Sequence, residues 1–318
     1  MRRPPFVLAL LLLTAGCEAL LGADFDRSLK DGGSLQGADG SAGGDDGDGT
    51  TPGGPKSDGG GGKKDGPSGD GNVPNAGRTP LDIFGAKLRV WLDAGKGAFT
   101  AGDGVSIISW NDQSGNAANG HVAGTGGGTI QLGKDQVNGL PAIVFDNDAW
   151  VLGDKSPDFG VNEDFYIAVV AAYSTLGPND RFFFSRWSSM SRGYALYAGR
   201  QDNPAVGATL DASGIVMSST TANTADGAFR VYALRRTAGS NGSAKLEIRV
   251  NGASTSAEMP YAPIPTDRPL AFGGAQEPNS VYSRFLVGSI AEIVVVQGTV
   301  SDTEAVDVET SLATKYAL

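Results

Sequence analysis

The chain has very few of the side chains that most often bind metals or act as nucleophiles. Its 318 residues include one cysteine and one histidine. The histidine, His121, lies in a glycine-rich stretch, so the sequence offers little material for a multi-histidine zinc site or a histidine-based catalytic triad. A single thiol forms no internal disulfide. The sequence therefore points away from zinc enzymes, histidine-based hydrolases and disulfide scaffolds.

Positive charge and long apolar runs are also scarce. The chain has 25 lysines and arginines against 35 aspartates and glutamates, a net charge of −10. This balance opposes bulk attraction to polyanions, so we expect no nucleic-acid partner. The apolar run at Phe6–Leu13 is about half the length of roughly 20 residues that a spanning helix needs.

The first residues have the pattern of a secretory signal peptide. Arg2 and Arg3 precede the short apolar run, and small residues lead into Cys17. The segment LTAGC resembles the lipobox of bacterial lipoproteins, which implies cleavage after residue 16 and a lipidated Cys17 at the new amino terminus. The alternative is ordinary signal cleavage nearby, with Cys17 incidental. On the lipobox interpretation we expect a lipid anchor in the membrane of a bacterial cell envelope, either periplasmic or at the cell surface, with the outer membrane favoured.

Residues 17–78 form a region with almost nothing to fill a core. Glycine, aspartate, serine and proline dominate it, as in GGDDGDGTTPGGPKSDGGGG. That composition is typical of a disordered linker, because too little apolar surface is available to offset the entropy of ordering. We therefore predict a flexible stalk that separates the anchor from a folded domain.

From residue 79 to 318 the pattern changes to short apolar runs separated by glycine, asparagine and aspartate turns. Such a pattern predicts an all-β fold, a sandwich of antiparallel sheets. The predicted strands are Leu88–Asp93, Val105–Trp110, Ala142–Asp146, Phe165–Tyr173, Arg181–Trp187, Gly193–Ala198, Phe229–Arg235, Lys245–Val250, Pro269–Phe272 and Ser289–Val296. The runs FYIAVVAAY and IAEIVVV are nearly all apolar, which favours central strands buried on both faces.

Two local signals set the ends of elements. Asn251-Gly252 follows the alternating strand KLEIRV and predicts a tight hairpin. Ser301 with Glu304 three residues later predicts a capping box, and apolar residues follow at helical spacing. We expect one C-terminal helix that packs on the sandwich.

Several segments together resemble the concanavalin A-like lectin/glucanase superfamily, in its laminin-G-like branch. They are LRVWLDAGKG, SWNDQSGNAANG, NGLPAIVFDNDAWVL and the C-terminal VGSIAEIVVVQGTVSDTEAVDVETSLATKYAL. The resemblance implies a jelly-roll sandwich closed by a helix. It implies little about the ligand, because one fold hosts many functions.

Catalysis is not expected. The retaining glucanases of this superfamily carry Glu-x-Asp-x-x-Glu on one strand, and that string does not occur here. Glu163 and Asp164 are adjacent and would point to opposite faces of a strand. Glu292 lies inside a predicted strand, and we interpret it as an acid that stands alone.

Binding is the favoured activity, and two groups of residues are candidates. Members of the superfamily often bind calcium near a sheet rim, and Asp146, Asn147 and Asp148 could supply its oxygen ligands. The other interpretation is a turn after the strand, rich in aspartate and asparagine. No cofactor is required on either interpretation. Aromatic rings that could stack on a sugar include Trp150, Trp187 and Tyr197.

The sequence thus predicts a lipid-anchored, lectin-like binding domain for a carbohydrate or an envelope protein. A structural or protein-interaction component of the envelope without a small ligand is the main alternative. A glycoside hydrolase is the third.

Overall fold

The computed structural model describes most of the chain from residue 77 onward. The described ranges are 77–123, 128–152, 157, 159, 163–174, 181–186, 193–199, 205–210, 216–219, 224–239, 243–259, 268–276 and 282–318. The predicted signal peptide, Cys17, the predicted linker up to residue 76 and Trp187 lie outside these ranges.

The described residues form two large antiparallel sheets, which confirms the predicted sandwich. Sheet I contains, in spatial order, β15 (Ala253–Met259), β14 (Ala244–Val250), β13 (Arg230–Ala238), β8 (Phe165–Tyr173), β19 (Val287–Gln297), β6 (Leu140–Asp146) and β5 (Thr129–Val137), with β1 (Leu88–Asp93) also paired to β19. Sheet II contains β12 (Val216–Ser218), β11 (Gly207–Leu210), β10 (Tyr194–Ala198), β9 (Arg181–Arg186), β16 (Ala271–Phe272), β7 (Trp150–Leu152) and β4 (Gly120–Val122).

Short elements complete the described fold. Two further strand pairs are β2 (Ala98–Thr100) with β3 (Ile107–Trp110), and β17 (Ala275–Gln276) with β18 (Tyr282–Ser283). The helical elements are α1 (Pro80–Phe84), a 3-10 turn at Gly85–Lys87, α2 (Ala94–Gly97) and the C-terminal α3 (Asp302–Tyr316). None of the helices in the described ranges has the length and apolar character to cross a membrane.

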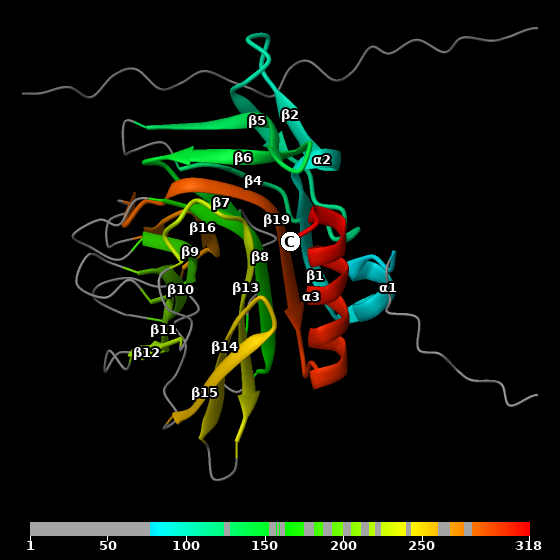
Figure 1. The fold of residues 1–318 in the computed structure, drawn as a ribbon, viewed down its shortest axis with the longest axis vertical. Coiled ribbons are helices and arrows are strands. Elements are labelled where there is room, and N and C mark those ends of the chain that lie inside the picture. Colours follow the sequence, from blue (N-terminus) through cyan, green and yellow to red (C-terminus); the bar gives the residue numbers. More distant parts are fainter. Residues whose placement is uncertain are drawn as a thin grey trace, which may run out of the picture. The chain divides into compact units, whose positions relative to one another are not determined.

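The elements stack in three layers, with sheet I in the middle (Figure 1). Sheet II covers one face of sheet I, and α1 and α3 cover part of the other, which we call the outer face. A separate apolar core fills each interface. Both β8 and most of β19 are buried on both faces, as the apolar runs predicted.

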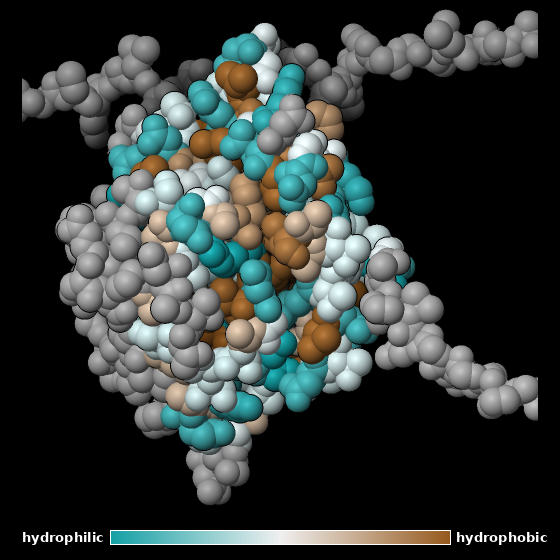
Figure 2. All heavy atoms as spheres, in the orientation of Figure 1, coloured by the Kyte–Doolittle hydropathy of each residue, from teal (hydrophilic) through white to brown (hydrophobic). Residues whose placement is uncertain are grey.

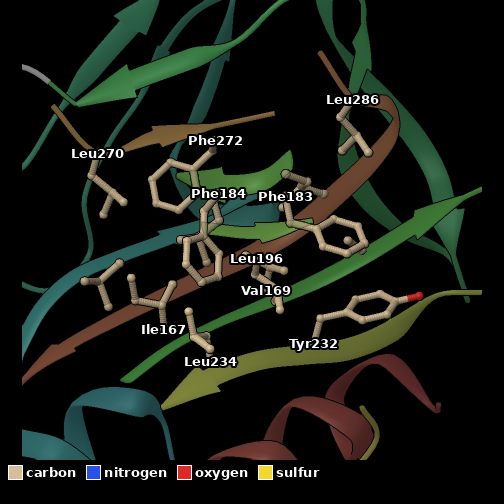
Figure 3. Close-up of a cluster of buried hydrophobic side chains, with 14 of the residues drawn as sticks. Ile167, Val169, Phe183, Phe184, Leu196, Tyr232, Leu234, Leu270, Phe272 and Leu286 are labelled. Atoms are coloured by element: carbon tan, nitrogen blue, oxygen red, sulfur yellow. The ribbon is translucent and has the colours of Figure 1, made fainter. Parts of the chain in front are cut away.

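The core between the sheets is rich in aromatic rings (Figure 3). Figure 3 shows side chains from β8 and β13 facing those of β9, β10 and β16, among them Ile167, Val169, Tyr232, Leu234, Phe183, Phe184, Leu196 and Phe272. Phe183 and Phe184 are neighbours in sequence and still share the core. The reason is a bulge at Phe183: Leu196 pairs with Phe184, whereas Tyr197 pairs with Phe182.

Strand β19 has a bulge of its own, and this one positions an acid. Ile290 pairs with Ala171 and Glu292 pairs with Val170, so Ala291 is an extra residue. Strict alternation from Ile290, which faces the core between the sheets, would turn Glu292 into that same core. The extra residue reverses the alternation and places Glu292 on the outer face, under α3.

The predicted turn and helix form as expected. Asn251 and Gly252 have φ of 47° and 82° and connect Val250 to Ala253, which is the geometry of a two-residue type I′ hairpin. Ser301 and Glu304 make a reciprocal capping box at the start of α3. At the other end Ala317 is left-handed, and the Leu318 N–H donates to the Ala313 carbonyl, as in a Schellman motif.

Some strands were not predicted because their sequences are polar. Strand β5 reads TIQLGKDQV and strand β15 reads ASTSAEM. The two strands form the opposite edges of sheet I, where one face of the sheet meets solvent. Edge strands need fewer apolar side chains than central ones, so the apolar pattern that identifies β8 is weak in them.

The capping box of α3 is open to a direct test. Ser301→Ala removes the acceptor for the Glu304 N–H and the donor to the Glu304 carboxylate. We expect the free energy of unfolding, measured by urea titration, to fall by about 1 kcal/mol. Ser254→Ala, an exposed substitution on β15, is the control. An equal effect of the two substitutions would show that the cap contributes nothing.

Candidate functional site

The structure places the aromatic candidates apart from one another. Trp150 is fully buried in the core between the sheets, with its ring edge-on to Trp110. Tyr197 lies on the other face of sheet II, 7% exposed, and its ring covers the backbone of Gly207 on the neighbouring strand. Neither ring offers an open face for stacking on a sugar. Trp187 is outside the described residues.

The acidic turn after β6 splits between solvent and interior. Asp146 and Asn147 are exposed, and Asn147 is left-handed with φ of 59°. Asp148 is buried, and its Oδ1 accepts a hydrogen bond from the Ala149 N–H. Within the described ranges no three acidic, histidine or cysteine side chains cluster as a metal site would require. The calcium site stays a prediction.

The loop around Asp112 is structural. One carboxylate oxygen of Asp112 accepts from the N–H groups of Trp91 and Ser114, and the other accepts from the Ser114 hydroxyl and the Ala118 N–H. Asn116 donates to the carbonyls of Leu88 and Arg89. These bonds fasten the loop to β1 and leave Asp112 no free lone pair for a ligand.

A groove runs over the part of the outer face of sheet I that lies beyond the helices. It has a volume of about 480 Å³, which is within the usual range for ligand sites. Strand pairing explains its lining: Gln131, Val144, Ser289 and Ala172 are successive partners across four strands, so their side chains share one face.

The groove presents hydrogen-bonding groups beside an aromatic ring. Thr129 and Asp146 form the next row of the same face, and both are exposed. Phe229 lines the groove and also packs against the apolar core between sheet I and the helices. Amide, hydroxyl and carboxylate groups next to an apolar surface are the combination that polar ligands such as sugars require. Of the described residues predicted for binding, Asp146 is the one that lines this groove.

A carboxylate pair, which the sequence did not reveal, lies under the C-terminal end of α3. Asp93 of β1 pairs directly with Glu292 of β19, so Glu292 does not stand alone. Both side chains are 1% exposed, and the Lys315 ammonium bridges them, at 2.7 Å from Asp93 Oδ2 and 2.5 Å from Glu292 Oε2. The sequence shows Asp93 in the motif WLD, but Trp91 and Asp93 meet Glu292 from about 200 residues away in the chain, so no local pattern reveals the pair.

Every oxygen of this pair is already bonded to the protein. Glu292 Oε1 accepts from Trp91 Nε1 at 2.6 Å, and Oε2 also accepts from the Tyr316 hydroxyl at 2.9 Å. Asp93 Oδ1 accepts from the Gly95 N–H. Burial raises the pKa of Glu292, and the nearby Lys315 ammonium lowers it. Burial lowers the pKa of Lys315, and the Glu292 carboxylate raises it.

The arrangement fits a structural clamp better than a catalytic dyad. In a glycosidase the scissile sugar bond lies between the two carboxyl groups, and one of the two donates a proton. Here Lys315 occupies the space between Asp93 and Glu292 and ties the last turn of α3 to β1 and β19. A hollow of about 280 Å³ adjoins the clamp, lined by Trp91, Lys96 and the N-terminal segment before α1.

Comparisons with known proteins support the fold. No protein-family model matches the chain, and no curated protein matches its sequence. Among solved structures, a mutant of a GH54 α-L-arabinofuranosidase soaked with 4-nitrophenyl α-L-arabinofuranoside is similar, with a TM-score of 0.54 and 14% identity over 75% of this chain and 66% of that one. An arabinofuranosidase complexed with arabinofuranosyl-α-1,2-xylobiose has a TM-score of 0.51 with the same identity and coverage.

The binding domain of Paraclostridial Mosquitocidal Protein 1 matches more loosely. Its TM-score is 0.48 at 12% identity, over 72% of this chain and 52% of that one. The chain therefore spans about half to two thirds of the length of the structures it matches. At these identities the likeness to the arabinofuranosidase structures shows the β-sandwich fold alone.

The clamp makes a prediction for stability. Lys315→Met leaves two adjacent buried carboxylates without their cation, and we expect the free energy of unfolding at pH 7 to fall by about 3–5 kcal/mol. Without the lysine the folded-state pKa of Glu292 rises further above its unfolded value of about 4.3. A carboxyl with a raised pKa favours the folded state below the unfolded pKa and loses that contribution as pH rises through the folded pKa. The deficit is therefore expected to shrink at pH 4.

Lys96→Met is the matched control, because Lys96 is 3.7 Å from the same Asp93 oxygen but 52% exposed. Guanidinium titrations of the three proteins at pH 4 and pH 7 make the comparison. We expect the control to change stability by about 0–1 kcal/mol. A Lys315→Met deficit of the same small size, or one that does not depend on pH, would contradict the clamp.

Proposed function

We propose that the protein is a lipid-anchored envelope lipoprotein whose sandwich is a non-catalytic, lectin-like module of the concanavalin A-like superfamily. The module binds a carbohydrate or an envelope partner. The observation that carries the proposal is the polar groove on the uncovered part of sheet I, where Thr129, Gln131, Asp146 and Ser289 line about 480 Å³ beside Phe229.

The contrast between the two parts of the outer face supports binding over catalysis. Under α3 the carboxylates of Asp93 and Glu292 are buried and accept hydrogen bonds from protein donors. In the groove Asp146 is exposed and Gln131 half-buried, so polar groups there can exchange water for a ligand's hydroxyls. A groove that is already shaped by strand pairing binds without the cost of ordering a loop.

A glycoside hydrolase is the second candidate, because the fold is shared with an arabinofuranosidase and Asp93 and Glu292 are direct partners. The bridging lysine and the burial of both acids favour the binding module. The fold of the arabinofuranosidases also suggests arabinose-substituted xylo-oligosaccharides as the first probes.

The binding prediction is tested on a panel of oligosaccharides by isothermal titration, with and without calcium. Gln131→Ala is expected to weaken binding about threefold to tenfold, the effect of one lost hydrogen bond. Ser256→Ala on the exposed face of β15 is the control and leaves binding unchanged. A lower affinity for the oligosaccharide after a calcium chelator is added would favour a metal at Asp146.

Other outcomes of that experiment separate the alternatives. Release of free sugar, abolished by Glu292→Gln, would replace the binding module with the hydrolase. If no glycan binds and a defined envelope protein binds instead, the protein-interaction alternative is favoured.

The anchor is tested separately. Cys17→Ala is expected to move the protein from the membrane fraction to the soluble fraction, because two or more acyl chains are what holds a protein stably on a bilayer. Ser34→Ala in the same segment is the control, and mass spectrometry should find an acylated amino terminus at Cys17. Retention of Cys17→Ala in the membrane, or an unmodified amino terminus elsewhere, would refute the anchor.

A further inference from the structure

A second hollow lies between α3 and the β13–β14 side of sheet I, apart from the groove. It has a volume of about 390 Å³, with Glu309 and Arg249 at its base and Val231, Ala313 and Leu318 among its aliphatic walls. Figure 2 shows apolar side chains gathered between the β14–β15 hairpin and α3, framed by hydrophilic ones. Val306 and Leu318 belong to the few large apolar side chains of the described surface that are well exposed, at 49% and 40%.

The base of this hollow is a buried charged cluster in which arginines and glutamates pair. Arg235, Glu247, Arg249 and Glu309 are each at most 7% exposed. Arg235 donates to Glu247, and Arg249 donates to both glutamates, at 2.7 Å to Glu247 and 2.5 Å to Glu309. Arg235 also pairs with the exposed Asp302 at the start of α3, so the two arginines face two buried carboxylates and one exposed carboxylate. Against the opposing effect of burial, the paired carboxylates raise the pKa of Arg249 and the arginines lower that of Glu247.

One oxygen of this cluster is left over. Glu309 Oε1 accepts from Arg249 Nε and, at 2.9 Å, from the Tyr166 hydroxyl. Glu309 Oε2 is buried and has no hydrogen-bond partner anywhere in the described part of the chain. A buried carboxylate oxygen without a donor pays the full cost of its lost hydration.

The free oxygen faces an opening that the hairpin keeps clear. A Cβ on Gly252 would lie 4.0 Å from Glu309 Oε2, and the glycine also supplies the left-handed conformation that the type I′ turn needs. The hollow therefore combines one acceptor, an aliphatic surface and buried glutamates that are both already paired with arginines.

We infer that this hollow is a binding site for a neutral, compact aliphatic molecule that carries one hydroxyl or amide donor. The donor bonds Glu309 Oε2, and the hydrocarbon body lies against Val231, Val306, Ala313 and Leu318. Both buried glutamates are already paired with arginines, which disfavours a cationic ligand, and an anionic ligand would be repelled by the Glu309 carboxylate. The site is separate from the glycan groove, so the two stand or fall independently.

The test uses the full chain and four rigid probes with the same hydrocarbon body: 1-adamantanol, 1-methoxyadamantane, 1-adamantylamine and 1-adamantanecarboxylate. Ligand-observed NMR and thermal melts measure binding. We expect 1-adamantanol to bind at least tenfold more tightly than the methoxy compound, which has the same body and no donor, since a hydrogen bond to a charged group contributes about that much.

Two substitutions locate the site. Ala313→Leu keeps a good helix former and fills the hollow, and we expect it to abolish binding of 1-adamantanol. Thr303→Leu, exposed at the start of α3 and outside the lining, is the matched control and leaves binding unchanged.

Three results would overturn the inference. Equal affinity for the alcohol and the methoxy compound would remove Glu309 as the acceptor. Tighter binding of the amine would show that the site selects a cation. No binding of any probe, or binding that survives Ala313→Leu, would show that the hollow is not the ligand site.

Discussion

The extra residue at Ala291 in β19 is the constraint on which the outer face of the molecule depends. Before the bulge, Val287 to Ile290 pair with β6, and after it, Glu292 to Val296 pair with β1. The bulge lies where the strand changes partner on that edge. Without it, the acid of IAEIVVV would enter the apolar core between the sheets, where an unpaired charge is prohibitively costly. With it, Glu292 meets Asp93, Trp91 and the end of α3.

That placement divides the outer face of sheet I into two parts with different properties. On one part, the helix is fixed by the Lys315 clamp at its C-terminal end and by Arg235 and Arg249 along its length. On the other part, strands β5, β6 and the beginning of β19 carry polar side chains that no helix covers. A rigid, half-covered sheet leaves a defined groove, which is why binding rather than chemistry is the function we propose.

Local features were predictable from the sequence, and long-range ones were not. The buried strand FYIAVVAAY, the Asn251-Gly252 turn and the Ser301 cap depend on neighbours in the chain, and each forms as predicted. The partnership of Asp93 with Glu292 depends on a strand register and a bulge that no local pattern reveals. Burial also misled the search for binding residues: Trp150 is core, as large aromatics in sandwiches usually are. The polar edge strand β5, which supplies much of the groove, lacked the apolar alternation that identifies a strand.

The central claim is that the uncovered part of sheet I is the ligand-binding surface. A crystal structure of the protein soaked with the tightest-binding oligosaccharide tests it most directly. The account predicts density for the sugar across β5, β6 and β19, within hydrogen-bonding distance of Gln131 and Asp146. Density on the outer face of sheet II near Tyr197, or within the hollow beside the Lys315 clamp, would contradict it.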